Sequence, residues 1–193
     1  IVHGGTFYAG RNPSTLLHAL ANVFHVQPKL RGRITVSFAG TIRESDRKIV
    51  KKLGLQNDVT FLGYLEHREC VRHMQSADVL WFIMDDDSSS PGKLYEYFGS
   101  RKTIFASIIE GYTKQLIEES GASVFVSPKD VKAHERAMVE LFSLFEKKKL
   151  PRVLQEFSGR FNRVTLTGEL AKQFESLMDY DKNAVVKLEE ARS

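Results

Sequence analysis

The chain has 193 residues, of which 42% are hydrophobic, and this is enough for one doubly wound domain with a sizeable core. Its 28 basic and 24 acidic residues give a net charge of +4 without a dense basic stripe between aromatic residues, which argues against a nucleic-acid partner. The single cysteine, Cys70, excludes an internal disulfide and suits a reducing compartment, and no apolar stretch approaches the roughly 20 residues of a membrane span.

The first residues of the chain are the end of a predicted strand, and Gly4 and Gly5 follow it directly. We therefore expect the chain to begin within a longer protein. Adjacent glycines allow backbone conformations and close approaches that other residues cannot make. After them, Asn12 and Pro13 predict the start of a helix, because they suit its N-cap and its first position. The apolar residues of this helix fall on one stripe: Leu16, Leu17, Leu20, Val23 and Phe24.

Strands and helices then alternate along the chain. Alternating apolar residues predict a strand over 34–39, and Gly54 is well placed to end the helix that follows it. A third strand ends at Leu62, directly before Gly63 and Tyr64. The predicted elements of this part are strand 34–39, helix 44–53, strand 59–62 and helix 67–76.

The stretch from 77 to 106 organises the rest of the chain. Val79–Met84 is an unbroken apolar run of strand length, which is typical of a central parallel strand covered on both faces. A polar loop over 85–90 follows it. Pro91 suits the first position of a helix, with Ser90 as its N-cap, so the predicted order is buried strand, polar loop and helix.

Lys93 would lie in the first turn of that helix, where the free N–H groups carry about half a positive charge. A cation there is unfavourable by roughly 0.3 to 1 kcal/mol unless an anion binds, and Gly92 leaves room for a phosphate to approach the backbone. Glu96 lies one turn further on, close to the same face, where its carboxylate could accept hydrogen bonds from sugar hydroxyls. The alternative is a solvated helix start with a surface pair between Lys93 and Glu96.

The remaining elements continue the alternation: strand 102–106, helix 111–120, strand 122–126 and a long helix over 131–145 with one buried face. This order predicts an α/β fold, a doubly wound parallel sheet of Rossmann-like type with helices on both faces. Ligands in such sheets bind beyond the carboxyl ends of the strands. The loops after Val2, Ala39, Leu62 and Met84 all fall at those ends.

The segment after residue 150 changes character. Its last helix carries an apolar stripe that no later strand covers, formed by Leu166, Leu170, Phe174 and Leu177. We expect a Rossmann-like domain over 1–150, a helical extension over 151–180 and a polar, frayed tail over 181–193. The extension packs either on this domain or on a domain outside the chain.

The segment SPGKLYEYFGSRKTIFA, which starts at Ser90, resembles the donor-site helix of retaining GT-B glycosyltransferases of family 4, the group 1 enzymes. The segments VTFLGYL, SADVLWFIM and GASVFVSP follow the order found in that family as well. The resemblance implies a single GT-B half whose partner is a nucleoside-diphosphate sugar, bound as the donor substrate.

The resemblance also implies roles for individual residues. Glu96 matches the ligand of the nucleotide ribose, Arg11 a basic residue that neutralises phosphate, and Gly63 a glycine in the loop beside the base. The family often has a second Glu, in contact with the transferred sugar, at the position of Ser88. The implied donor-binding residues are Gly4, Gly5, Arg11, Gly63, Ser90, Gly92, Lys93, Leu94 and Glu96.

As the resemblance implies, the full-length protein would be a glycosyltransferase of the hexosyltransferase type, active in the synthesis of cell-surface polysaccharide or glycoconjugates. The catalytic residues and the acceptor site would lie in a missing N-terminal domain, so the isolated half would be inactive. Any membrane contact of this cytoplasmic protein would be made through that missing half. No cofactor and no metal are expected, because a helix start can hold phosphate without one.

Other chemistry stays open at this point. Asp85 to Asp87 could hold a diphosphate through a metal, although three acids in a loop are a weak signal. The six histidines lack zinc spacing, and neither GxSxG nor a complete GxGxxG is present. A non-catalytic α/β binding module with a degenerate donor site is one alternative, for which Ser88 is the argument. A sugar-nucleotide epimerase with the same two-domain architecture is another.

Overall fold

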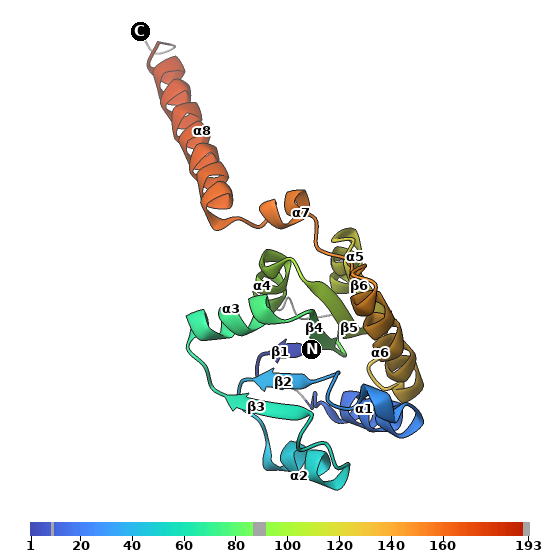
Figure 1. Ribbon diagram of the computed structural model, residues 1–193. Coiled ribbons are helices and arrows are strands. Elements are labelled where there is room, and N and C mark those ends of the chain that lie inside the picture. Colours follow the sequence, from blue (N-terminus) through green and yellow to red (C-terminus); the bar gives the residue numbers. More distant parts are fainter. Residues whose placement is uncertain (9, 87–91, 191–193) are drawn as a thin grey trace.

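The structure is a computed structural model that describes residues 1–8, 10–86 and 92–190, with 179–190 described as backbone only. Six parallel strands form one sheet in the order β3-β2-β1-β4-β5-β6, and helices cover both faces (Figure 1). The predicted α/β doubly wound sheet is confirmed. Its strands are β1 Val2–Gly4, β2 Val36–Ala39, β3 Val59–Gly63, β4 Val79–Met84, β5 Thr103–Ile108 and β6 Ser123–Val126.

The helices alternate with the strands as the sequence predicts, with shifts of one or two residues at most ends. They are α1 Ser14–Val26, the short 3-10 helix η1 Pro28–Leu30, α2 Glu44–Lys52, α3 His67–Ser76, α4 Gly92–Ser100, α5 Tyr112–Glu119, α6 Val131–Glu146, α7 Gln155–Gly159 and α8 Arg163–Glu190.

Strand β4 joins two hydrophobic cores because successive side chains of a strand point to opposite faces of the sheet. Trp81 packs with α1 and α6 on one face, whereas Leu80 and Phe82 pack with α3, α4 and α5 on the other. Trp81 and Leu80 are fully buried. This two-sided burial explains the unbroken apolar run, and the five apolar positions predicted for the stripe of α1 are buried as well.

Strands β1 and β4 meet at the middle of the sheet but pair only once, at Val2 and Leu80, whereas β4 and β5 pair at six positions. Beyond that single pair, side chains form hydrogen bonds with the backbone groups of β1 and β4 that have no partner on the neighbouring strand. The Trp81 carbonyl accepts from His3 Nδ1 at 3.0 Å and from the Tyr97 hydroxyl at 3.1 Å. The Gly4 N–H donates to the same Tyr97 hydroxyl at 2.9 Å. The two strands therefore part toward their carboxyl ends and leave a crevice at the topological switch point.

The start of α1 differs from the prediction, and the predicted start of α4 lies outside the described residues. Helix α1 begins at Ser14, so Pro13 is its N-cap and Asn12 lies one residue before the predicted cap position. The Asn12 side-chain oxygen still accepts from the Ser14 N–H at 3.0 Å. The predicted N-cap Ser90 and first residue Pro91 lie outside the described residues, which begin again at Gly92.

The end of the chain corrects one expectation. Helix α8 continues to Glu190, past the point where the polar, frayed tail was expected. The segment 179–190 contains neither Gly nor Pro, so nothing in its sequence stops a helix that has already begun.

Helix α8 projects away from the sheet (Figure 1). The expected apolar stripe is exposed along its described part: Leu166 is 45%, Leu170 51%, Phe174 57% and Leu177 64% exposed. Leu170, Phe174 and Leu177 are thus more than half exposed, whereas Leu166 lines a cavity together with Tyr95 and Glu96 of α4. Across the described part of the chain, no helix combines the length and the apolar character that a membrane crossing requires.

Tyr97→Phe tests whether side chains hold β1 to β4. The substitution removes the acceptor for the Gly4 N–H and one donor to the Trp81 carbonyl, both in a buried place. We expect a loss of about 1–3 kcal/mol in the free energy of unfolding, measured by urea titration. Tyr95→Phe, at a partly exposed position of the same helix, is the control and should change stability by less than about 0.5 kcal/mol. Equal stability of Tyr97→Phe and the wild type would contradict this account.

Candidate functional site

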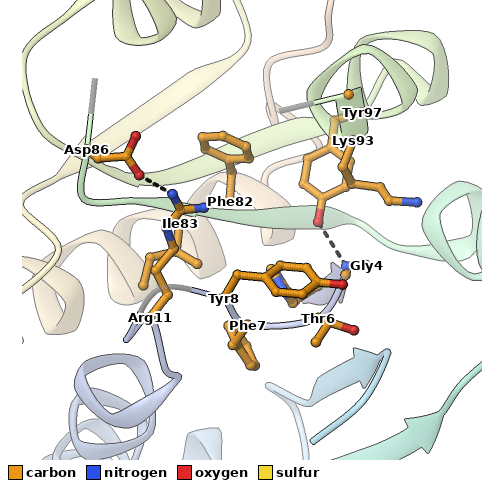
Figure 2. A pocket seen from close by; sticks show the side chains of 13 residues that line it. Gly4, Thr6, Phe7, Tyr8, Arg11, Phe82, Ile83, Asp86, Lys93 and Tyr97 are labelled. Carbon is orange, nitrogen blue, oxygen red and sulfur yellow. Dashed lines mark hydrogen bonds and ion pairs between the residues drawn. The ribbon is translucent and has the colours of Figure 1, made fainter. Parts of the chain in front are cut away.

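A cavity of about 740 Å³ opens at the crevice between β1 and β4, a size typical of ligand pockets. It lies at the carboxyl ends of the strands, where doubly wound sheets bind their ligands. Its walls come from the loop after β1, the end of β4 and the start of α4 (Figure 2). The lining residues are His3, Gly4, Gly5, Thr6, Phe7, Tyr8, Arg11, Phe82, Ile83, Asp86, Gly92, Lys93 and Tyr97.

A second cavity of about 240 Å³ adjoins the first, and Gly5, Thr6 and Lys93 line both. It extends toward Tyr64, which follows β3, and toward the buried Cys70 of α3. Burial raises the pKa of the Cys70 thiol, and the nearby Lys93 charge opposes that shift. Lys93 therefore stands between two connected spaces at the edge of the sheet.

Backbone contacts hold the loops after β1, β2 and β3 together. The Gly5 N–H donates to the Ala39 carbonyl and the Gly40 N–H to the Gly63 carbonyl, both at 2.7 Å. Gly40 has a φ of +136°, and a Cβ at this position would lie 2.5 Å from the Gly5 oxygen, so no other residue fits without a shift. Gly63 is thus part of the scaffold. It lines neither cavity, and its contact with a nucleotide base stays a prediction.

The start of α4 contains the pair that the sequence suggested as the alternative to a ligand site. Lys93 Nζ lies 2.9 Å from Glu96 Oε2, and both side chains are about one-third exposed. Gly92 lines the main cavity, and the space that a Cβ would occupy there is empty. The Leu94 side chain is buried in the core, so only its backbone could reach a ligand. Glu96 faces a third cavity, of about 430 Å³, with Tyr95.

Arg11 bridges the two sides of the main cavity. Its Nε lies 3.0 Å from Asp85 Oδ1, and its Nη2 contacts Asp86 Oδ2. The guanidinium is largely enclosed, with only 15% of the side chain exposed. Two of the three acids considered as a metal site, Asp85 and Asp86, are therefore paired with the predicted phosphate ligand, and Asp87 lies outside the described residues. In the segments that the structure describes, no three carboxylate, imidazole or thiol groups converge as metal ligands would, and the absence of a metal stays a prediction.

The structure brings five predicted site residues around one cavity: Gly4, Gly5, Arg11, Gly92 and Lys93. It leaves Gly63, Leu94 and Glu96 beside that cavity, and Ser90 lies outside the described residues.

His3 lines the cavity, but the sequence did not predict it as a site residue, because it belongs to no recognised motif. The Trp81 carbonyl can only accept, so His3 Nδ1 carries the proton and Nε2 keeps its lone pair. Nε2 has no hydrogen-bond partner among the described residues. Burial, and to a lesser degree the Lys93 charge, lower the pKa of His3 to about 4 against the opposing effects of the Trp81 and Gly5 backbones. The ring is neutral at pH 7 and stacks on Phe7, with 4.6 Å between the centroids.

A buried Ser–His pair between β5 and α6 is structural. Ser107 Oγ lies 2.7 Å from His134 Nε2, and both residues are fully buried. The Trp81 indole N–H donates to Ser107 Oγ at 2.7 Å, and His134 Nδ1 donates to the Asp130 carbonyl at 2.7 Å. Since His134 donates from Nδ1, its Nε2 accepts the Ser107 proton. The serine has no access to a substrate.

A family described as "Glycosyl transferases group 1" matches residues 1–143 of this chain. The chain belongs to this family. The resemblance inferred from the sequence is thereby confirmed, and the cavity at β1 and β4 is the candidate ligand site of a group 1 glycosyl transferase domain.

Solved structures of other glycosyltransferases share this fold. Anabaena Alr3699/HepE in complex with UDP and glucose is 20% identical with a TM-score of 0.65, and the match covers 91% of this chain and 48% of that one. The pneumococcal O-GlcNAc transferase GtfA in complex with UDP and GlcNAc is 14% identical with a TM-score of 0.62, covering 93% and 35%. WaaG, a glycosyltransferase involved in lipopolysaccharide biosynthesis, is 14% identical with a TM-score of 0.62, covering 82% and 40%.

This group 1 domain therefore spans about half the length of HepE and less than half of the other two. At these identities the likeness shows the fold. No match was found among curated protein sequences.

His3→Gln should remove part of the acid sensitivity of this group 1 domain. The pKa of His3 is about 4 in the folded protein against an ordinary value of 6.5, so the unfolded chain binds the proton first as the pH falls. The stability that the neutral ring contributes is present above pH 6.5 and is lost toward pH 4, with about 2 kcal/mol gone at about pH 5. Between neutral pH and pH 5, the free energy of unfolding of His3→Gln should fall by about that much less.

The matched control is His18→Gln, which removes an imidazole from an exposed position on α1. If the free energy of unfolding of His3→Gln falls as steeply with falling pH as that of the wild type, His3 is not the buried neutral group described above.

Proposed function

We propose that this chain is the donor-binding half of a glycosyltransferase, of the hexosyltransferase type, that transfers a sugar from a nucleoside-diphosphate sugar to an acceptor. One observation carries the proposal. The glycine loop after β1 and the start of α4, with Lys93, face a single cavity at the switch point of the sheet. This combination of free backbone N–H groups, a cation and an open glycine suits a diphosphate.

The diphosphate would bind at Gly92 and Lys93, on the side of Gly4 and Gly5. Lys93 is paired with Glu96, so a phosphate would exchange places with that carboxylate or share the ammonium with it. Arg11 would reach the phosphates only by exchanging its acidic partners. Because the diphosphate is the leaving group, cations and N–H groups placed there stabilise the charge that develops as the sugar bond breaks. No metal is needed in this arrangement.

The nucleoside would lie on the side of the second cavity. That space adjoins Lys93 and reaches Tyr64 after β3, while Gly63 sits directly before it in the chain. Glu96 lines neither of these two cavities, but its carboxylate lies beside Lys93, which lines both, and from there it would bind the ribose hydroxyls. Complexes of Anabaena HepE with UDP and with UDP-glucose support a nucleotide sugar as the ligand class, because that protein shares this fold.

The acceptor site and the catalytic residues would come from another domain of the full-length protein, and the isolated half would be inactive. Two observations support this proposal. The chain spans about half of HepE, and helix α8 presents an apolar stripe that the Rossmann-like domain leaves exposed. We further propose a cytoplasmic enzyme of cell-surface polysaccharide or glycoconjugate synthesis, with any membrane contact through the other domain.

Calorimetric titration of the chain with UDP, GDP and ADP, with and without magnesium, tests the donor site. We expect one nucleotide to bind without magnesium and Lys93→Ala to weaken it by about tenfold, since a charge-assisted contact to phosphate is lost. Lys114→Ala is the control, because Lys114 also pairs with a nearby glutamate, Glu110, but lies on α5 away from the cavity. Failure of all three nucleotides to bind, or equal affinity of Lys93→Ala and the wild type, would overturn the site.

Glu96→Ala tests whether Glu96 binds the ribose directly or acts only through its ion pair with Lys93. The substitution frees the Lys93 ammonium, so inorganic pyrophosphate should bind as tightly as to the wild type or more tightly. The preferred nucleotide should bind about tenfold more weakly, because it loses the ribose contacts. The same calorimetric titration measures both ligands. Parallel changes for pyrophosphate and nucleotide would show that Glu96 acts only through Lys93.

A further inference from the structure

The main cavity has two chemically different ends. Figure 2 shows Arg11 and Asp86 together at one end, and Lys93 beside Tyr97 and Gly4 at the other. The Lys93 side chain points away from Asp86 in this view. The residues proposed for the diphosphate therefore lie at the Lys93 end, and the Asp86 end is left for the rest of the donor.

The Asp86 end carries an excess of negative charge. Arg11 supplies one positive charge and shares it between two carboxylates, those of Asp85 and Asp86. Of these two, only Asp86 lines the cavity, and it is the only carboxylate among the described lining residues. An anionic group placed at this end would meet unfavourable charge, whereas a hydroxyl would meet an acceptor.

His3 borders the same cavity without adding charge to it. The residue is 8% exposed, and its Nδ1 holds the ring proton against the Trp81 carbonyl. The neutral ring adds no positive charge to offset Asp86.

We propose that Asp86 is a specificity residue of this site, which accepts a hydrogen bond from a hydroxyl of the transferred sugar and excludes sugars that carry a carboxylate. The expected donor class is thus a neutral hexose rather than a uronic acid. A neutral sugar gains a hydroxyl-to-carboxylate hydrogen bond, and the pairing with Arg11 keeps the Asp86 side chain in place. A uronate brings a like charge into a partly enclosed site. The inference rests on the proposed function, because it presupposes that a nucleotide sugar occupies the cavity.

Asp85 provides a matched control for Asp86. Both residues follow β4, both accept from the Arg11 guanidinium, and their side chains are similarly exposed, at 36% and 32%. Asp85→Asn and Asp86→Asn therefore remove the same charge from the same ion-pair cluster. Only Asp86→Asn changes a group that faces the cavity.

The test is calorimetric titration of wild type, Asp85→Asn and Asp86→Asn with UDP, UDP-glucose and UDP-glucuronic acid at about 0.15 M salt. The two sugar nucleotides differ only at the sixth carbon of the sugar. We expect the wild type to bind UDP-glucose about tenfold more tightly than UDP-glucuronic acid, Asp85→Asn to keep that ratio, and Asp86→Asn to reduce it to about threefold or less. If the chain binds GDP rather than UDP, GDP-mannose and GDP-mannuronic acid form the equivalent pair.

The outcomes separate this inference from the function on which it rests. If the nucleotide diphosphate binds but the wild type does not discriminate, or both variants lower the ratio equally, the role of Asp86 is refuted and the donor site stands. If none of UDP, GDP and ADP binds, the donor site and the inference fail together. A far-ultraviolet circular dichroism spectrum of each variant, unchanged from the wild type, shows that the ratio reports on the site rather than on folding.

Discussion

The site depends on two hydrogen bonds to one backbone carbonyl. In the middle of a parallel sheet the Trp81 carbonyl would ordinarily accept from the neighbouring strand. Here it accepts from His3 and Tyr97, which come from β1 and α4. These two side chains satisfy the backbone groups that the parting of β1 and β4 leaves without strand partners. A cavity can therefore exist at the centre of the sheet without leaving that carbonyl or the Gly4 N–H unpaired.

Trp81 connects this arrangement to helix α6. Its carbonyl accepts hydrogen bonds beside the cavity, while its indole N–H donates to Ser107, which in turn donates to His134. Burial lowers the pKa of His134 and raises that of Tyr97, so both groups stay neutral under ordinary conditions. Neutral, fully hydrogen-bonded polar groups can be buried at little cost, whereas a charge at either position would be expensive. The crevice between β1 and β4 and the packing of α6 thus share one residue of β4.

The fold could be predicted from the sequence because the patterns that indicate strands and helices are formed by neighbouring residues. The two-sided apolar run of β4, the stripe of α1 and the glycines at helix ends each follow from neighbouring residues, and so does the Lys93–Glu96 pair one turn apart. The contacts that shape the cavity are different. Arg11 pairs with Asp85 and Asp86, which are more than seventy residues away in the sequence, and no periodic pattern in the sequence predicts that pairing. From the sequence, Tyr97 cannot be distinguished from the other core residues of α4. The neutral state of His3 depends on its burial, which arises only in the folded chain.

The ion pairs at the mouth of the cavity also bear on the entropy of binding. A long basic side chain loses about 2 kcal/mol of rotamer freedom when a ligand immobilises it. Arg11 and Lys93 have given up most of that freedom on folding, because carboxylates on the same domain already hold them in place. An arriving ligand exchanges one ordered partner for another instead of ordering a mobile cation. The carboxylates around this cavity thus preorganise its cations for a ligand.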